Sequence, residues 1–194
     1  MNAHLELIEE FIASFPLVAR DLSFSEVLHP AAAQLAIDSA AEYGRREWRP
    51  RRVTTDPTEL APLYAKLPAR FPPLYEQLVL SYRWAEVDLQ SFALLANPLG
   101  DGLKGLLNSI HGDRNLTNEL VNHGYMQFGR GTGGHYDPVC FDISLRKNRD
   151  YRIVKLDHEE ILCNYRIKVV SEIAPSFRAL VLQTIERASA ARKS

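Results

Sequence analysis

The sequence contains only two cysteines and no long apolar run. Cys140 and Cys163 are too few for a disulfide-rich secreted scaffold, and they form no Cys-x-x-Cys pair of the kind that binds zinc or exchanges electrons. We therefore expect reduced thiols and a cytoplasmic location. Glu6, Glu9 and Glu10 interrupt the apolar residues near the N-terminus, which argues against a secretory signal there, and no segment approaches the ~20 apolar residues of a membrane span.

A large charge of one sign is also missing. The 23 basic and 24 acidic side chains leave a formal net charge of -1, so no global field would draw the protein onto nucleic acid or an anionic membrane. Hydrophobic residues make up 46% and charged residues 24% of the chain, values that are ordinary for a folded globular protein. With 194 residues, the chain is long enough for one domain with some elaboration.

Apolar residues at helical spacing predict helices near both ends of the chain. Residues 1–15 predict an amphipathic helix that ends near Pro16, and the segment after Pro175 predicts a closing helix. Another helix is predicted over residues 30–43, because Pro30 suits the first turn of a helix.

The middle of the chain combines short helices with strands. Asp56 and Pro57 form a cap and first turn for a short helix, and another helix follows the Pro-Pro pair at residues 72–73. Residues 48–54 predict a strand, which Pro50 would confine to a sheet edge. The next predicted elements are a buried strand over residues 92–95 and short helices over residues 103–110 and 116–122.

From Gly124 onward the pattern changes to strands separated by Gly-rich or charged turns. The predicted strands cover residues 125–128, 139–144, 151–156 and 165–170. Phe128 and Phe141 are expected to cover one core from neighbouring strands. Helices first, then strands and a closing helix, indicate an α+β fold: a single domain with a mostly antiparallel sheet packed against helices.

Residues 129–134 form a glycine-rich run, Gly-Arg-Gly-Thr-Gly-Gly. Exposed amides in such a loop can surround a phosphate. A dinucleotide fingerprint, however, needs a helix directly after the glycines, and here the next residues read as a strand. No Walker lysine follows, and no Gly-x-Ser-x-Gly elbow supports a serine hydrolase. A hairpin turn is therefore the interpretation that we favour.

Several acidic residues and a histidine lie around the predicted strands. His158 and Glu159 begin a segment similar to the zinc-protease helix, but Leu162 stands where the second histidine would be. Asp137, Asp142, His158 and Glu159 could still form a small metal-dependent hydrolase, since residues distant in sequence can meet in space. We favour the alternative that Asp137 and Asp142 accept backbone hydrogen bonds. We therefore predict no catalytic residue, no metal-binding residue and no cofactor.

Two other features have both a structural and a functional interpretation. Cys140 lies between apolar neighbours in a predicted strand, so an inert buried thiol is favoured over a nucleophile. Five arginines between Arg45 and Arg52 surround Trp48, a combination that could contact nucleic acid. Charges that protect an exposed edge strand are the alternative that we favour. The sequence leaves the role of this cluster open.

The second half of the sequence contains an ordered series of short motifs. They are Leu67-Pro68 with the helix after it, the strand and turn at residues 92–98, the strand at 124–129 that ends in Phe-Gly, the glycine-containing turn and strand at 133–142, the strand and polar turn at 153–159, and the helix start at 174–177. In this order they resemble the SUKH superfamily, which groups Smi/Knr-type cell-wall-assembly regulators with bacterial toxin-immunity proteins.

The resemblance implies an α+β module that binds another protein and shares no catalytic residues, so we expect a protein-binding protein and not an enzyme. Residues 60–194 would form the SUKH-like domain, and residues 1–59 a helical N-terminal extension. The narrower expectation is an immunity protein that covers a bacterial toxin domain, and the other is a regulatory scaffold in envelope synthesis. Trp84, Tyr125 and Tyr136 are the candidate partner-binding residues, because aromatic side chains anchor protein interfaces.

Overall fold

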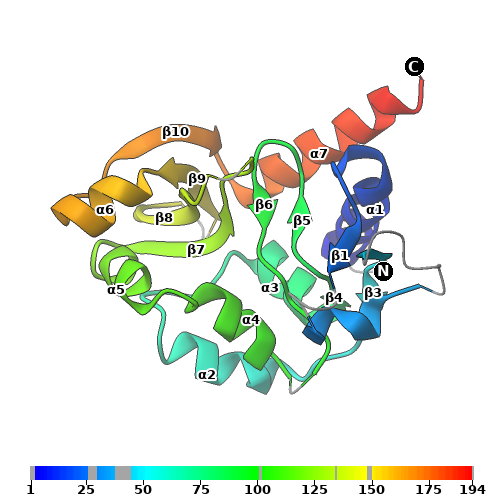
Figure 1. Ribbon diagram of the computed structural model, residues 1–194, viewed down its shortest axis with the longest axis horizontal. Helices are drawn as coiled ribbons and strands as arrows, with labels where there is room; N and C mark the ends of the chain where they lie inside the picture. The colour runs from blue at the N-terminus through cyan, green and yellow to red at the C-terminus, as the bar shows by residue number, and fades with distance from the viewer. Residues whose placement is uncertain are drawn as a thin grey trace.

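A six-stranded antiparallel sheet with helices on both faces forms the centre of the protein (Figure 1). The computed structural model describes residues 3–25, 30–37, 45–100, 102–133, 135–147 and 150–193. From one edge to the other, the strands are β10 (Val169–Ala174), β9 (Asp150–Leu156), β8 (Pro138–Lys147), β7 (Tyr125–Arg130), β6 (Ala93–Leu94) and β5 (Val87–Asp88). The predicted α+β fold with an antiparallel sheet is therefore confirmed.

The helices cover the sheet in two layers. Above one face lie α1 (Ala3–Val18), α3 (Pro73–Ser81) and α7 (Phe177–Ala191), and above the other lie α5 (Arg114–Asn122) and α6 (His158–Asn164). Successive side chains of a strand point to opposite faces. Phe141 and Ile153 accordingly join the large apolar cluster under the first layer, whereas Cys140 and Val154 join a small cluster under the second.

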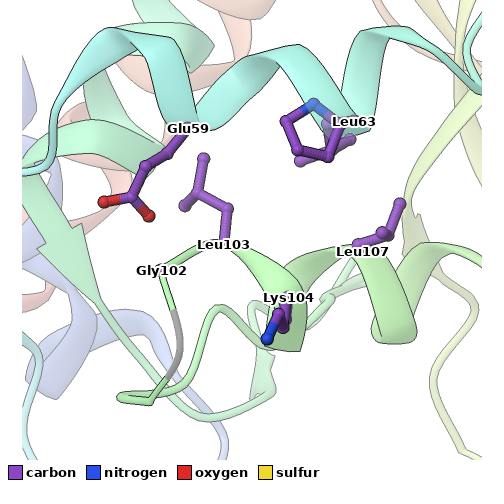
Figure 2. Close-up of a pocket in the computed structure, with 7 residues that line it drawn as sticks. Glu59, Leu63, Gly102, Leu103, Lys104 and Leu107 are labelled. Atoms are coloured by element: carbon purple, nitrogen blue, oxygen red, sulfur yellow. The ribbon is translucent and has the colours of Figure 1, made fainter.

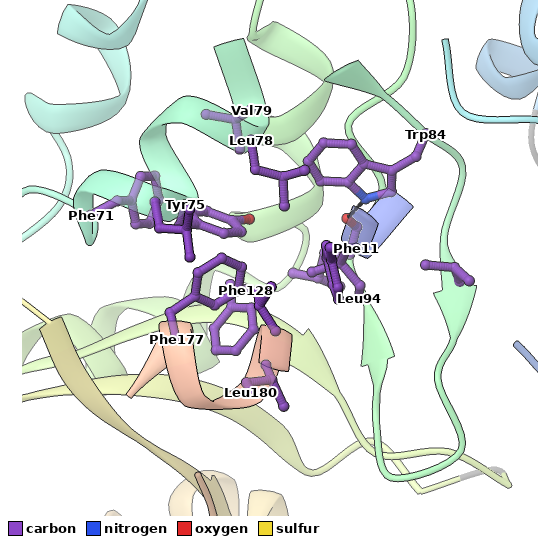
Figure 3. Packing of buried hydrophobic residues seen from close by; sticks show 14 of the residues in the cluster. Phe11, Phe71, Tyr75, Leu78, Val79, Trp84, Leu94, Phe128, Phe177 and Leu180 are labelled. Atoms are coloured by element: carbon purple, nitrogen blue, oxygen red, sulfur yellow. Dashed lines mark hydrogen bonds between the residues drawn. The ribbon is translucent and has the colours of Figure 1, made fainter. Parts of the chain in front are cut away.

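Aromatic side chains from distant parts of the chain meet in the large cluster (Figure 3). The rings of Phe128 and Phe141 stack at 4.2 Å between neighbouring strands, which confirms that they cover one core. Tyr75 of α3 lies 5.3 Å from Phe141, and Phe177 of α7 lies 6.3 Å from Phe11 of α1. The first helix therefore shares its core with the last one, and the expected N-terminal extension packs into the same domain.

The first helix is longer than the sequence suggested. It continues through Pro16 to Val18, because a proline in the last turn removes only one backbone hydrogen bond. The predicted helix over residues 30–43 is wrong in its described part, which forms the 3-10 helix η1 (Pro30–Leu35). Residues 38–43 of that prediction lie outside the described residues.

Two short ribbons accompany the large sheet. They are β1 (Ser23–Ser25) with β2 (Arg45–Glu47), and β3 (Arg51–Arg52) with β4 (Tyr82–Arg83). The predicted strand over residues 48–54 is therefore wrong in its bounds, since Trp48 makes only an isolated bridge to Ala36 and Pro50 separates β2 from β3. Pro50 cannot donate a ladder hydrogen bond.

The predicted strand over residues 165–170 is also wrong. The chain forms α6 first, and β10 begins only at Val169. The remaining predicted elements are confirmed with shifts of a few residues: η2 (Pro57–Leu60), α2 (Ala61–Tyr64), α3, β6, α4 (Lys104–Ile110), α5, β7, β8, β9 and α7. Among the described residues, no helix combines the length and the apolar character needed to cross a membrane.

Candidate functional site

Large apolar side chains are exposed mainly at the end of the molecule where α6 lies (Figure 1). In the described part of the chain these side chains are Tyr136, Leu162, Tyr165, Val169, Val170 and Leu182. Leu162 and Tyr165 belong to α6 and its C-cap, and the two valines belong to β10. Tyr136 lies against His158, the first residue of α6, with ring centroids 6.3 Å apart. Only Leu182, on α7, stands apart from this group.

We call Tyr136, His158, Leu162 and Tyr165 the α6 surface. Tyr165 is 71% exposed and Tyr136 is 61% exposed, which is unusual for side chains of this size. His158 and Leu162 are four residues apart, so they share one face of the helix. The surface therefore presents two tyrosine rings and a leucine around one helix.

Local sequence explains why α6 forms at this place. Asp157 caps the helix, because its Oδ1 accepts a hydrogen bond of 3.2 Å from the Glu160 backbone amide. Tyr165 ends the helix in the left-handed region, at φ 52°. Ile161 is the buried residue of the helix and packs into the small apolar cluster. One inward side chain thus holds α6 on the sheet, and its neighbours remain outside.

A histidine and an aspartate join α6 to the turn between β7 and β8. The Nδ1 atom of His158 lies 3.0 Å from Oδ1 of Asp137, and the His158 backbone amide donates to the same oxygen at 3.2 Å. The expectation that Asp137 accepts a backbone hydrogen bond is confirmed. On the other side, the Arg130 guanidinium lies 5.7 Å from the centre of the Tyr136 ring and donates to Glu86 at 2.5 Å. Tyr136 is therefore placed between two anchored side chains.

The residues of the alternative hydrolase do not assemble. Asp142 lies inside β8, where its carboxylate bonds to Arg152 and Ser144, and Glu159 is exposed on α6. Only His158 and Asp137 of the four candidates meet. Within the described ranges, no group of three or more His, Cys, Asp and Glu side chains is arranged to hold a metal ion.

The three candidate partner-binding residues lie in different environments. Trp84 is fully buried and donates from Nε1 to the Leu95 carbonyl at 2.9 Å, so its nomination as a surface anchor is wrong for the folded state. Tyr125 is half-buried and packs against the small cluster. Burial, and then the nearby Asp142, raise the pKa of Tyr125. Only Tyr136 presents its ring to solvent.

Three other sequence features have structural roles. Cys140 is buried, and burial followed by the charge of Asp142 raises the pKa of its thiol well above the ordinary value, so an inert thiol is the better interpretation. The glycine-rich run is part of the β7–β8 hairpin, in which the Gly131 amide donates to the Asp137 carbonyl at 2.8 Å. This supports the turn and not a phosphate loop.

Acidic side chains answer part of the arginine cluster. Arg45 forms an ion pair of 2.7 Å with Asp21, and Arg52 forms one of 2.8 Å with Glu9 of α1. Both arginines are on short exposed strands. These contacts favour the expectation of protective charges on strand edges over a phosphate-binding surface.

The cavities of the structure lie away from the α6 surface. One of about 390 Å³ separates the turn that carries Glu59 and Leu63 from the start of α4 (Figure 2). At its rim the Glu59 carboxylate packs so closely on Gly102 that an added Cβ would overlap it. Another, of about 580 Å³, lies between α7 and strands β9 and β10. Its charged lining residues, Lys155, Glu172, Glu186 and Arg187, sum to zero formal charge, so neither cavity selects an ionic ligand.

Comparisons with protein-family models, with curated proteins and with solved structures found no match for this chain. The resemblance to the SUKH superfamily therefore stays a prediction from the sequence. The fold and the exposed side chains have to support any functional conclusion by themselves.

Proposed function

We propose that this chain is a protein-binding module and that the α6 surface is its docking site. The observation that carries the proposal is the concentration of exposed apolar side chains there, with Tyr136 and Tyr165 as the largest. Aromatic residues are enriched at protein interfaces, where a few such anchors supply most of the binding free energy.

The anchoring of Tyr136 supports the same proposal. A side chain that is already ordered loses less conformational entropy when a partner covers it. Tyr136 lies between His158 and Arg130, which are in turn bound to Asp137 and Glu86. The surface thus has one pre-positioned ring beside the more exposed ring of Tyr165.

The SUKH resemblance adds a narrower hypothesis about the partner. In an immunity protein, the α6 surface would cover the active surface of a toxin domain in the cytoplasm. In a regulatory scaffold, it would hold an enzyme or regulator of envelope synthesis. Both hypotheses require a protein partner, and the identity of the captured protein separates them.

Site-specific photo-crosslinking in the native cell tests the proposal. A photoreactive phenylalanine analogue at Tyr165 should give one defined adduct, which mass spectrometry then identifies. The matched control carries the analogue at Leu182, which is 46% exposed on α7 outside the α6 surface. The same adduct from both positions, or none from Tyr165, would show that the α6 surface is not the docking site.

The affinity for the identified partner provides the second measurement. Leu162→Ser and Tyr165→Ser should each weaken binding by about tenfold or more, a loss of ~1.4 kcal/mol, because each removes an apolar contact. Neither side chain is buried in the free protein, so the melting temperature should stay the same. Leu182→Ser is the control and should change neither quantity.

A further inference from the structure

The two edges of the sheet differ in their surroundings. Along β5, the Arg20 amide donates to the Asp88 carbonyl at 3.0 Å, and the Arg20 side chain lies 3.6 Å from the Asp88 carboxylate. At the opposite edge, β10 pairs only with β9 in the described part of the chain. Its first four residues, from Val169 to Glu172, are all exposed. An exposed strand edge is a template for pairing with another chain.

The charges along β10 indicate which chain would fit. Lys168 and Glu172 have opposite charges and lie four residues apart, with Val170 midway between them. In an antiparallel arrangement about a two-fold axis, Lys168 of each copy comes beside Glu172 of the other, so the contact occurs twice. A parallel arrangement would instead bring like charges together. The strand is therefore complementary to itself in the antiparallel direction.

The existing ion pairs leave room for these contacts. Lys168 donates to Asp157 at 3.0 Å, but an ammonium group has three hydrogens to donate. Glu172 lies 3.7 Å from the Arg152 guanidinium, beyond hydrogen-bonding distance, so its oxygens can accept from a second copy. Both side chains are on the exposed part of the segment.

The strand is also irregular, which limits the length of the contact. Register shifts against β9 occur between Val169 and Ser171 and between Glu172 and Ala174. Bulges of this kind twist an edge strand and restrict edge-to-edge pairing. Only a short central stretch is left, with the exposed Val169 and Val170 as its apolar part. Such a contact would be weak and dependent on concentration.

We infer that two copies of this chain associate through their β10 edges about a two-fold axis near Val170, with Lys168 of each copy paired to Glu172 of the other. This goes beyond the proposed function, because the β10 edge is separate from the four residues of the α6 surface. A dimer can exist without a partner protein, and a partner can bind a monomer.

Sedimentation velocity over a wide concentration range tests the dimer. The unmodified chain should sediment faster as the concentration rises. Lys168→Glu and Glu172→Lys should each weaken association by about tenfold or more, because each places two pairs of like charges together. An equimolar mixture of these two variants should form a heterodimer, since every cross-contact is then between opposite charges. The double variant should dimerise like the unmodified chain.

Further variants separate the dimer from a folding defect. Val170→Lys brings two lysines together at the axis without changing an ion pair, and it should sediment as a folded monomer. Arg45→Glu alters an exposed ion pair on β2 and should leave association unchanged. The inference is overturned if the unmodified chain stays monomeric at every concentration, or if mixing the two charge variants restores nothing. It is also overturned if the β10 variants change only the binding of the crosslinked partner.

Discussion

Replacing Asp142 with asparagine tests how a buried charge stabilises the sheet. The Asp142 side chain is only 1% exposed. Its carboxylate accepts hydrogen bonds of 2.6 Å from Arg152, 3.0 Å from the Ser144 amide and 2.5 Å from the Ser144 hydroxyl. Asp142→Asn keeps the size of the side chain and removes its charge, so any change in stability reports on the charge.

The expected loss is about 2–4 kcal/mol at pH 7. A hydrogen bond to a charged group contributes about 1.5–3 kcal/mol, and removing one member of a buried ion pair costs about 3–5 kcal/mol. The Arg152 side chain is 33% exposed, so water can solvate part of the charge left behind, and the lower part of that range applies. For a domain of this length the melting temperature should fall by about 5–15 °C in thermal unfolding followed by circular dichroism.

The pH dependence distinguishes this explanation from a simple packing defect. Burial raises the pKa of Asp142, but the hydrogen bonds from Ser144 and Arg152 outweigh burial, and the pKa lies below its ordinary value. A lowered carboxyl pKa stabilises the fold above the ordinary value near 4, and this stabilisation is lost as the pH falls through the lowered pKa. The difference between the unmodified chain and Asp142→Asn should therefore be complete at pH 7 and decrease below about pH 4.

Asp21→Asn is the matched control. Asp21 also pairs with an arginine, Arg45, at 2.7 Å, but both side chains are 52% exposed. Its replacement should change the free energy of unfolding by no more than about 0.5 kcal/mol. Equal stability of Asp142→Asn and the unmodified chain at pH 7, or a difference that grows in acid, would refute the reasoning.

Three other predictions concern buried and exposed groups. A thiol reagent should modify the exposed Cys163 in the folded protein and reach the buried Cys140 only on unfolding; two equally fast reactions would contradict this. Gly129→Ala should lower the free energy of unfolding by about 1–3 kcal/mol, since its Cβ would lie 2.7 Å from the Phe92 ring, and unchanged denaturant unfolding would be inconsistent with that contact. Tyr75→Phe should raise this free energy by up to about 1 kcal/mol or leave it unchanged, because the buried hydroxyl has no hydrogen-bond partner, and a clear loss would reveal one.

The fold could be predicted where long periodic patterns coincide with clear breakers. The closing helix has apolar residues at helical spacing and a serine cap at Ser176, and it forms as expected. The β7–β8 hairpin follows from alternating apolar residues around a glycine-rich turn. In contrast, α6 has only seven residues and one buried side chain, Ile161, so periodicity carries little information about it.

The candidate site could be predicted only in part. Tyr136 was identified because it is an aromatic residue beside a turn, but the same reasoning selected Trp84, whose indole is buried. Residue type does not distinguish an aromatic anchor from an aromatic core residue. Leu162 and Tyr165 were missed because residues 165–170 resemble a half-buried strand. The cap at Asp157 was the signal that could have indicated a helix there.

The exposed residues of α6 contribute little to the stability of the free chain, and this makes them informative. Apolar burial stabilises a fold in proportion to the surface removed from water. Tyr165 leaves most of its surface in water, whereas Ile161 leaves none. A serine in place of Tyr165 would therefore fold equally well, while a serine in place of Ile161 would open a cavity under the helix. Folding accounts for Ile161 but not for Tyr165, and a partner that covers the α6 surface would account for both.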